Sequence, residues 1–152
     1  MKVDIRLDTK ELEKALNRTK DEIQKQIPIA LLRTAQFGTQ IILDRTEKGK
    51  GINGPFKPYS PFYAKAKSKG WPRTLTRPSF GGDASGIVNL NVTGKMLSSI
   101  QQKLDGQSSV KIYFGRATEA KKAAFNNERR PFFGFNVSEK QRLQTFFGKA
   151  FK

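Results

Sequence analysis

The fold is decided by a stretch in the second half of the chain, Leu90-Asn91-Val92-Thr93-Gly94-Lys95-Met96-Leu97-Ser98-Ser99-Ile100. Thr93 is a candidate helix N-cap, because its hydroxyl oxygen can accept a hydrogen bond from the first turn. Met96, Leu97 and Ile100 then recur at helical spacing and predict an apolar face. Gly94 suits a place where the backbone passes close to a neighbour. The stretch therefore predicts a capped helix packed against a core.

The segments that follow carry strand and helix signals in turn. Leu104-Asp105-Gly106 marks a turn, and residues 110–114 alternate as a half-buried strand does. The Ala-rich residues 117–125 predict a helix that ends at Arg130-Pro131, because the residue before a proline avoids the helical region. Ser138-Glu139-Lys140-Gln141 resembles a capping box and opens a last helix, whose apolar face holds Leu143, Phe146 and Phe147.

The N-terminal third predicts one strand and a long helical region. Val3, Ile5 and Leu7 alternate with polar residues as in a strand. After an N-cap at Asp8 or Thr9, apolar and small side chains recur every three or four residues: Leu12, Leu16, Thr19, Ile23 and Ile27. Pro28 interrupts this pattern, and a second apolar stripe runs from there to Glu47, where Gly49 ends it. These runs form either a helical hairpin or one long kinked helix.

Residues 48–86 have a different composition, rich in glycine, proline, aromatic and basic residues. A short helix is predicted over Pro61 to Lys69, and the rest is predicted to be a long loop or arm. Residues 49–54 match the G-x-G-x-x-G string of dinucleotide-binding sites, but the required preceding strand, following helix and later acid are missing. We therefore interpret residues 49–54 as a flexible loop.

Composition narrows the function classes. The 152 residues fit a single domain over residues 1–152, and no apolar run is long enough for a membrane span. The N-terminus lacks a secretory pattern, so we expect synthesis in a cytoplasm. The chain has no Cys and no His, which removes thiol and imidazole catalysis and the commonest metal ligand. We expect no enzyme activity, no cofactor and no metal.

The net charge of +16 indicates an anionic partner. Residues 48–82 contain eight bases and no acid, interleaved with aromatic side chains. The candidate DNA-facing or partner-facing residues of this loop are Lys57, Lys65, Lys67, Lys69, Arg73 and Arg77. Such a loop could hold nucleic acid by phosphate contacts and stacking on Tyr63 or Trp71, or it could pack its aromatic side chains on a neighbouring subunit. The sequence favours neither over the other.

Four short strings, taken in order, resemble one family: the tail-completion, or virion morphogenesis, proteins at the head–tail neck of tailed bacteriophages. They are Gly54-Pro55-Phe56-Lys57-Pro58-Tyr59-Ser60 followed by Tyr63-Ala64 and Lys67, the stretch Leu90 to Ile100, Val110-Lys111-Ile112-Tyr113-Phe114-Gly115, and Arg130-Pro131-Phe132-Phe133-Gly134-Phe135. With the leading helices, the resemblance covers nearly the whole chain. The chain departs from the family at residues 124–129, where members often have a His/Gln/Gly-containing stretch, and at residues 71–86, which match nothing.

The resemblance implies a non-catalytic virion protein that forms a ring, with six copies expected. The ring would join the connector or head-completion proteins to the tail tube or terminator proteins, with DNA passing through it and no membrane involved. The resemblance also implies a structural motif made of Thr93, Gly94, Arg130, Pro131, Phe132, Phe133 and Gly134. The alternative function is a cytoplasmic nucleic-acid-binding module that uses residues 48–82.

The expected fold class is α+β. A small antiparallel sheet packs with one or two long N-terminal helices and a C-terminal helix, and residues 48–86 form a long basic loop region. Six copies of a +16 chain would carry +96, so ring closure is predicted to depend on salt, DNA or acidic neighbours.

Overall fold

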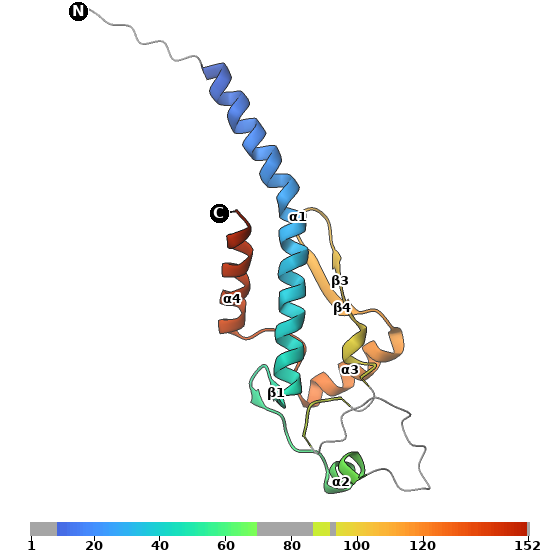
Figure 1. The fold of residues 1–152 in the computed structure, drawn as a ribbon. Coiled ribbons are helices and arrows are strands. Elements are labelled where there is room, and N and C mark those ends of the chain that lie inside the picture. Colours follow the sequence, from blue (N-terminus) through green and yellow to red (C-terminus); the bar gives the residue numbers. More distant parts are fainter. Residues whose placement is uncertain (1–8, 70–86, 92–93, 152) are drawn as a thin grey trace, which may run out of the picture.

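The computed structural model describes residues 9–69, 87–91 and 94–151, and it has the α+β fold that the sequence predicts (Figure 1). The elements follow in the order α1 (Thr9–Glu47), β1 (Lys50–Gly51), β2 (Gly54–Pro55), α2 (Pro61–Lys69), η1 (Leu97–Ser99), β3 (Ile100–Leu104), β4 (Val110–Phe114), α3 (Ala117–Arg129), α4 (Val137–Gly148) and η2 (Lys149–Phe151). The strand predicted over residues 3–7 lies outside the described residues.

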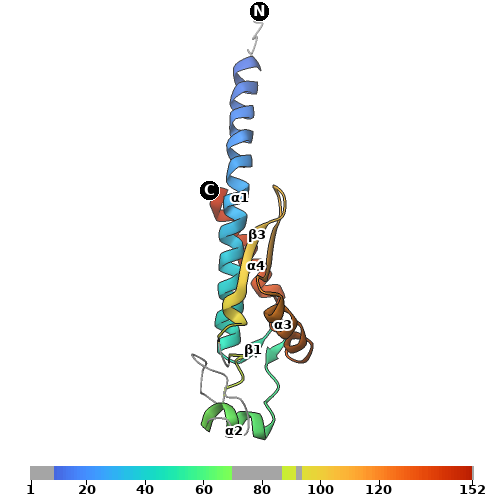
Figure 2. The same ribbon diagram turned by 90° about the vertical axis from the view of Figure 1, so that its right-hand side faces the viewer.

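Helix α1 is a single helix of 39 residues with Pro28 inside it, so the long kinked helix is the correct alternative. Figure 1 shows a bend about midway along α1, as expected where proline removes a hydrogen bond of the helix. The half after Pro28 packs against α4 and the β3–β4 hairpin. The half before Pro28 extends beyond the rest of the protein, and every described side chain from 13 to 26 is exposed (Figures 1 and 2).

Strands β3 and β4 form an antiparallel hairpin, and β4 lies at the predicted residues 110–114. The register pairs Ile100 with Phe114 and Leu104 with Val110. Both strands alternate between half-buried and exposed side chains, which is the pattern of a two-stranded sheet with one packed face. The packed face lies against α1, and α3 follows β4 closely in space (Figure 2).

The core brings together buried side chains from α1, η1, α3 and the loops between elements, with partly buried residues of β3 and β4 packed against them. Its buried members are Ile42, Phe56, Leu90, Met96, Leu97, Ala123 and Phe132. Phe132 has no exposed surface, and Ile42 of α1 is 1% exposed. Phe114 and Phe133 pack against this cluster while remaining partly exposed. The core thus lies where the C-terminal half of α1 meets the hairpin, α3 and the turn before α4.

The structure corrects the prediction of a helix within residues 90–100. Met96 and Leu97 are buried as expected, but the helix is a single 3₁₀ turn, η1, because Ile100 already pairs with Phe114 as the first residue of β3. Thr93 lies outside the described residues. Gly94 has a φ of +73°, and a Cβ there would meet only Asn91 Oδ1 at 3.8 Å. Gly94 is therefore required for its backbone conformation rather than for close approach.

Helix α3 covers the predicted Ala-rich residues 117–125, continues to Arg129 and ends at Arg130-Pro131 as expected. One further correction concerns the start of α4. The capping box of α4 is formed by Asn136 and Glu139 rather than by Ser138 and Gln141. Asn136 is the better cap, because its side chain accepts a hydrogen bond from Glu139 N at 2.8 Å and Glu139 Oε2 accepts one from Asn136 N at 2.9 Å.

The loop predicted over residues 49–54 is an ordered hairpin, which corrects the interpretation as flexible. Strands β1 and β2 pair antiparallel, with Gly51 opposite Gly54. The hairpin is held from outside its own turn, because Ile52 N donates a hydrogen bond to Pro131 O at 2.8 Å. Helix α2 begins and ends at the predicted residues.

Candidate functional site

The four strings that carry the family resemblance meet in one region of the structure. Arg130 donates hydrogen bonds to Lys57 O at 2.9 Å and to Pro58 O at 3.0 Å, which ties the last string to the first. Tyr59 Oη of the first string accepts a hydrogen bond from Leu90 N at 3.1 Å. The third string reaches the second through the hydrogen bond from Gly115 N to Ser99 O. The strings are therefore joined in space as well as ordered in sequence.

Aromatic contacts complete this junction. The rings of Phe114 and Phe132 lie edge to face with centroids 6.3 Å apart, and Phe114 and Phe133 lie 4.8 Å apart. Phe132 and Phe133 lie in a turn that is neither helix nor strand. In this turn two consecutive side chains can both contact Phe114 of β4. Such ring pairs stabilise a core somewhat beyond the area they bury. The Arg130–Gly134 turn thus packs its two phenylalanines against β4.

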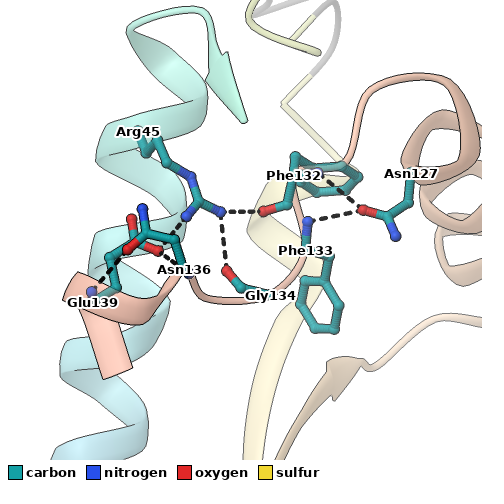
Figure 3. A network of polar contacts seen from close by, with 7 residues as sticks. All are labelled: Arg45, Asn127, Phe132, Phe133, Gly134, Asn136 and Glu139. Carbon is teal, nitrogen blue, oxygen red and sulfur yellow. Dashed lines mark hydrogen bonds and ion pairs between the residues drawn. The ribbon is translucent and has the colours of Figure 1, made fainter. Parts of the chain in front are cut away.

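Arg45 fixes this turn to α1 and α4. Its guanidinium donates hydrogen bonds to Phe132 O at 2.6 Å and to Gly134 O at 3.0 Å, and forms an ion pair with Glu139 at 2.5 Å (Figure 3). The side chains of Arg45 and Glu139 are each 9% exposed. The planar guanidinium suits this task, because it presents several donors in fixed directions to one carboxylate and two carbonyls. One side chain therefore joins three elements.

Asn127 of α3 holds the same turn from the opposite side. Its Oδ1 accepts hydrogen bonds from Phe132 N and Phe133 N, both at 2.9 Å (Figure 3). Because two consecutive backbone N–H groups donate to one acceptor, this contact fixes the conformation of the peptide between the two phenylalanines. The turn is consequently held by a cation on its carbonyl side and by an amide oxygen on its N–H side.

A basic and aromatic hollow lies beside the junction. It has a volume of about 350 Å³ and is lined by Tyr59, Ser60, Tyr63, Leu90, Phe125, Asn126, Arg129 and Arg130. The guanidinium of Arg130 lies over the Tyr59 ring at 4.9 Å, and that of Arg129 lies over the Phe125 ring at 4.4 Å. Burial and the neighbouring Tyr59 raise the pKa of Tyr63, and Arg130 partly opposes this shift. The Tyr63 phenol thus stays neutral at physiological pH.

The predicted partner-facing lysines have different positions in the structure. Lys57 and Lys65 are exposed, as such a role requires. Lys67 is 5% exposed, and its ammonium group donates hydrogen bonds to Ile87 O and Asn89 Oδ1, both at 2.7 Å. Lys67 is therefore a structural residue, and the prediction that it faces DNA or a partner is wrong. Lys69 ends α2, and Arg73 and Arg77 lie outside the described residues.

Several residues of the junction were not predicted from the sequence: Arg45, Asn127, Arg129 and Glu139 in its role as partner of Arg45. Arg45 lies near the end of an amphipathic helix, where a base is ordinarily solvated and interacts favourably with the helix dipole. Its separation of 94 residues from Glu139 leaves no local pattern to detect. The signal for Asn136 was present, because Asn136-Val137-Ser138-Glu139 fits the cap spacing as well as the string beginning at Ser138.

Within the described residues, no group of three or more Asp and Glu side chains is placed to hold a metal ion. The described helices also include none with the length and apolarity that crossing a membrane requires.

Comparison with known proteins gives no relative for this chain: no family model, no curated protein and no solved structure matches it.

Proposed function

We propose that this chain is a structural protein of a tailed bacteriophage that assembles into a ring at the head–tail neck. The ring would complete or connect the tail and leave a passage for DNA. In this role the protein carries out no chemistry, and its function is the shape and charge of its surfaces. The partners are further copies of the chain, the connector or head-completion proteins on one side, and tail tube or terminator proteins on the other.

The observation that carries the proposal is the convergence of the four family-like strings on one junction. A chance likeness in four short strings gives no reason for Arg130 to contact Lys57 O and Pro58 O, or for Tyr59 to contact Leu90. Strings that determine a fold are expected to contact one another in this way. We take this convergence as support for the likeness, and through it for the proposal.

The charge distribution also supports assembly around DNA. The chain has 29 basic and 13 acidic residues, and exposed bases lie at the junction, among them Lys57 and Arg129. A basic lumen attracts DNA without reading its sequence, because the attraction is to the phosphate backbone. This is the property needed by a passage through which a whole genome moves.

Electron microscopy of the purified protein at high salt tests the proposal. We expect closed rings with a central opening, and a uniform population of monomers under all salt conditions would contradict the expectation. A variant with Lys57 and Lys65 changed to Gln serves as the companion sample. Ring formation should survive in this variant, because we expect these side chains to face the lumen or the partner proteins and not the interface between copies.

The alternative, a nucleic-acid-binding module, is favoured by one observation: the hollow that combines Tyr59, Tyr63 and Phe125 with two arginines. Aromatic faces and cations together are the usual means of holding single-stranded nucleic acid. Affinity would then fall steeply with salt and would drop further on Arg129→Gln and Lys57→Gln. A matched variant, Lys103→Gln and Lys111→Gln on the outer face of the hairpin, should keep its affinity under this alternative.

A further inference from the structure

The half of α1 before Pro28 presents an apolar stripe that nothing in the described structure covers. We call residues 10–27 the arm. Leu16 is 60% exposed and Ile23 is 43% exposed. These residues are seven positions apart, so they lie on nearly the same face of the helix. The stripe continues toward Phe37, fourteen positions further, where α4 does cover α1 through the stacked rings of Phe37 and Phe146 at 4.6 Å.

The arm is continuous with the packed half of α1, but its own apolar side chains remain exposed. Helices in proteins gain most of their stability from packing an amphipathic face. Among the residues that the structure describes, none covers Leu16 and Ile23 enough to bury them, and the polar residues around them make the arm amphipathic. The arm therefore has the properties of an element that is completed by another chain.

A receiving surface exists between α1 and α4. This α1–α4 hollow has a volume of about 350 Å³, and its lining includes Phe37, Gln141, Arg142, Phe146 and Lys149. Phe146 is 38% exposed, so an apolar surface is available to an incoming side chain. The guanidinium of Arg142 lies 5.6 Å from the centre of the Phe37 ring, at the rim of this apolar floor. The hollow thus combines aromatic rings with basic groups.

The arm cannot fill the hollow of its own chain. The arm and Phe37, which lines the hollow, both belong to α1, which is one continuous helix from Thr9 to Glu47, and Phe37 lies ten residues beyond the end of the arm. At 1.5 Å per residue, Ile23 and Phe37 are about 21 Å apart along the helix. The occupant must therefore come from another molecule.

The charge of the arm favours a second copy of this chain as that molecule. Residues 9–27 hold five bases and four acids, whereas residues 28–152 hold 22 bases and seven acids. The arm is consequently a part of the chain that can approach the basic body of another copy with little net repulsion. Glu13 and Glu22 lie on opposite flanks of the stripe, roughly 80–100° from its centre. They match the basic groups of Arg142 and Lys149.

We propose that the arm of one copy docks into the α1–α4 hollow of the next, with Leu16 and Ile23 on the rings of Phe37 and Phe146. Glu13 and Glu22 then face Arg142 and Lys149. The contact joins two different surfaces, so repeating it produces a closed ring or an open filament rather than a dimer. The inference rests on the self-assembly proposed above, and not on the phage context.

The chain contains no cysteine, which allows a direct cross-linking test. Two variants, Gln26→Cys in the arm and Gln141→Cys at the hollow, are mixed at high salt and treated with a short thiol cross-linker. We expect a covalent dimer in the mixture and in neither variant alone. A single chain carrying both changes should give a ladder of higher multimers. In the matched control, Lys25→Cys takes the place of Gln26→Cys. Position 25 lies on the side of the arm that faces away from the apolar stripe, so the cross-linking yield should be severalfold lower.

Charge exchange separates docking from a general effect on the fold. Glu22→Arg and Arg142→Glu should each lower the cross-linking yield severalfold, and a mixture of the two variants should recover most of it. A dimer from Gln26→Cys alone would overturn the proposal in favour of arm-to-arm contact. Absence of cross-linking would also overturn arm docking, and light scattering on the unmodified protein then tests the proposed self-assembly separately. An oligomer would mean that the chain self-assembles without arm docking, whereas a monomer would contradict both proposals.

Discussion

The guanidinium of Arg45 and the carboxylate of Glu139 form an ion pair at 2.5 Å between two helices whose sequences are separated by 94 residues. Glu139 also caps α4 through its hydrogen bond with Asn136 N, and Arg45 also binds two carbonyls of the Phe132–Gly134 turn. The pair therefore sets the position of α4 against α1, and with it one wall of the α1–α4 hollow. A contact inside the core thus shapes a surface proposed for assembly.

Removing the charge of Glu139 should destabilise the protein strongly. Glu139→Gln keeps a side chain that can serve in the capping box, but it leaves Arg45 without its anion. We expect a loss of about 3–5 kcal/mol in the free energy of unfolding, because an unpaired buried charge is costly. Denaturant unfolding followed by circular dichroism measures this. The control is Asp105→Asn, which breaks the exposed pair with Lys111 and should cost at most about 1 kcal/mol. Equal losses in the two variants would contradict the role assigned to Arg45.

Asn127 offers a test of the turn itself. Asn127→Ala removes the oxygen that accepts from Phe132 N and Phe133 N, and we expect a loss of about 1–3 kcal/mol, because unsatisfied N–H groups are left behind. Asn127→Asp keeps an acceptor oxygen, so its loss in the free energy of unfolding should be clearly smaller. If the two variants melt together well below the original protein, the acceptor oxygen is not what matters at this position.

The two phenylalanines of the turn should differ in their contribution to stability. Phe132 has no exposed surface, so Phe132→Ala should cost about 3–5 kcal/mol. Phe133 is only partly buried beside Phe114, and Phe133→Ala should cost less. Comparing the midpoints of thermal unfolding tests this order. An unchanged midpoint for Phe133→Ala would assign that ring to an interface between molecules.

Gly51 is required by close approach. A Cβ on Gly51 would lie 2.3 Å from Pro131 O, the atom that accepts the hydrogen bond from Ile52 N. Gly51→Ala should therefore separate the β1–β2 hairpin from the Arg130–Gly134 turn and lower the melting temperature by several degrees. Gly148→Ala provides the comparison, since a Cβ there would meet nothing within 4 Å. A melting temperature as high for Gly51→Ala as for Gly148→Ala would show that the hairpin can move without cost.

The elements that the sequence predicts well are those with a strong local pattern. Strand β4 and helix α2 have the predicted bounds, because alternation in one and a proline start in the other are local signals. The α1 pattern predicted a long helix but left open whether Pro28 separates two helices. The local sequence around Pro28 does not decide this question. The answer depends on how residues 30–47 pack on the rest of the protein, which sets the direction of the second half of α1.

The site was harder to predict, because its contacts join distant residues. Arg130-Pro131-Phe132-Phe133-Gly134 was recognised as a motif, yet Arg45 and Asn127, which hold it, come from helices whose local patterns explain them as solvated side chains. Lys67 was misassigned for the opposite reason. Its neighbours Lys65 and Lys69 suggested a basic surface, whereas the turn of α2 directs Lys67 toward Ile87 O and Asn89 Oδ1.

The central claim is that copies of this chain assemble with one another, and light-scattering chromatography of the purified protein tests it most directly. The mass is measured at low and high salt, with and without DNA. The account predicts a ring-sized species without DNA, favoured by high salt, because screening weakens the repulsion between copies that each carry +16. A protein that stays monomeric at every salt concentration and changes mass only when DNA is added would contradict it.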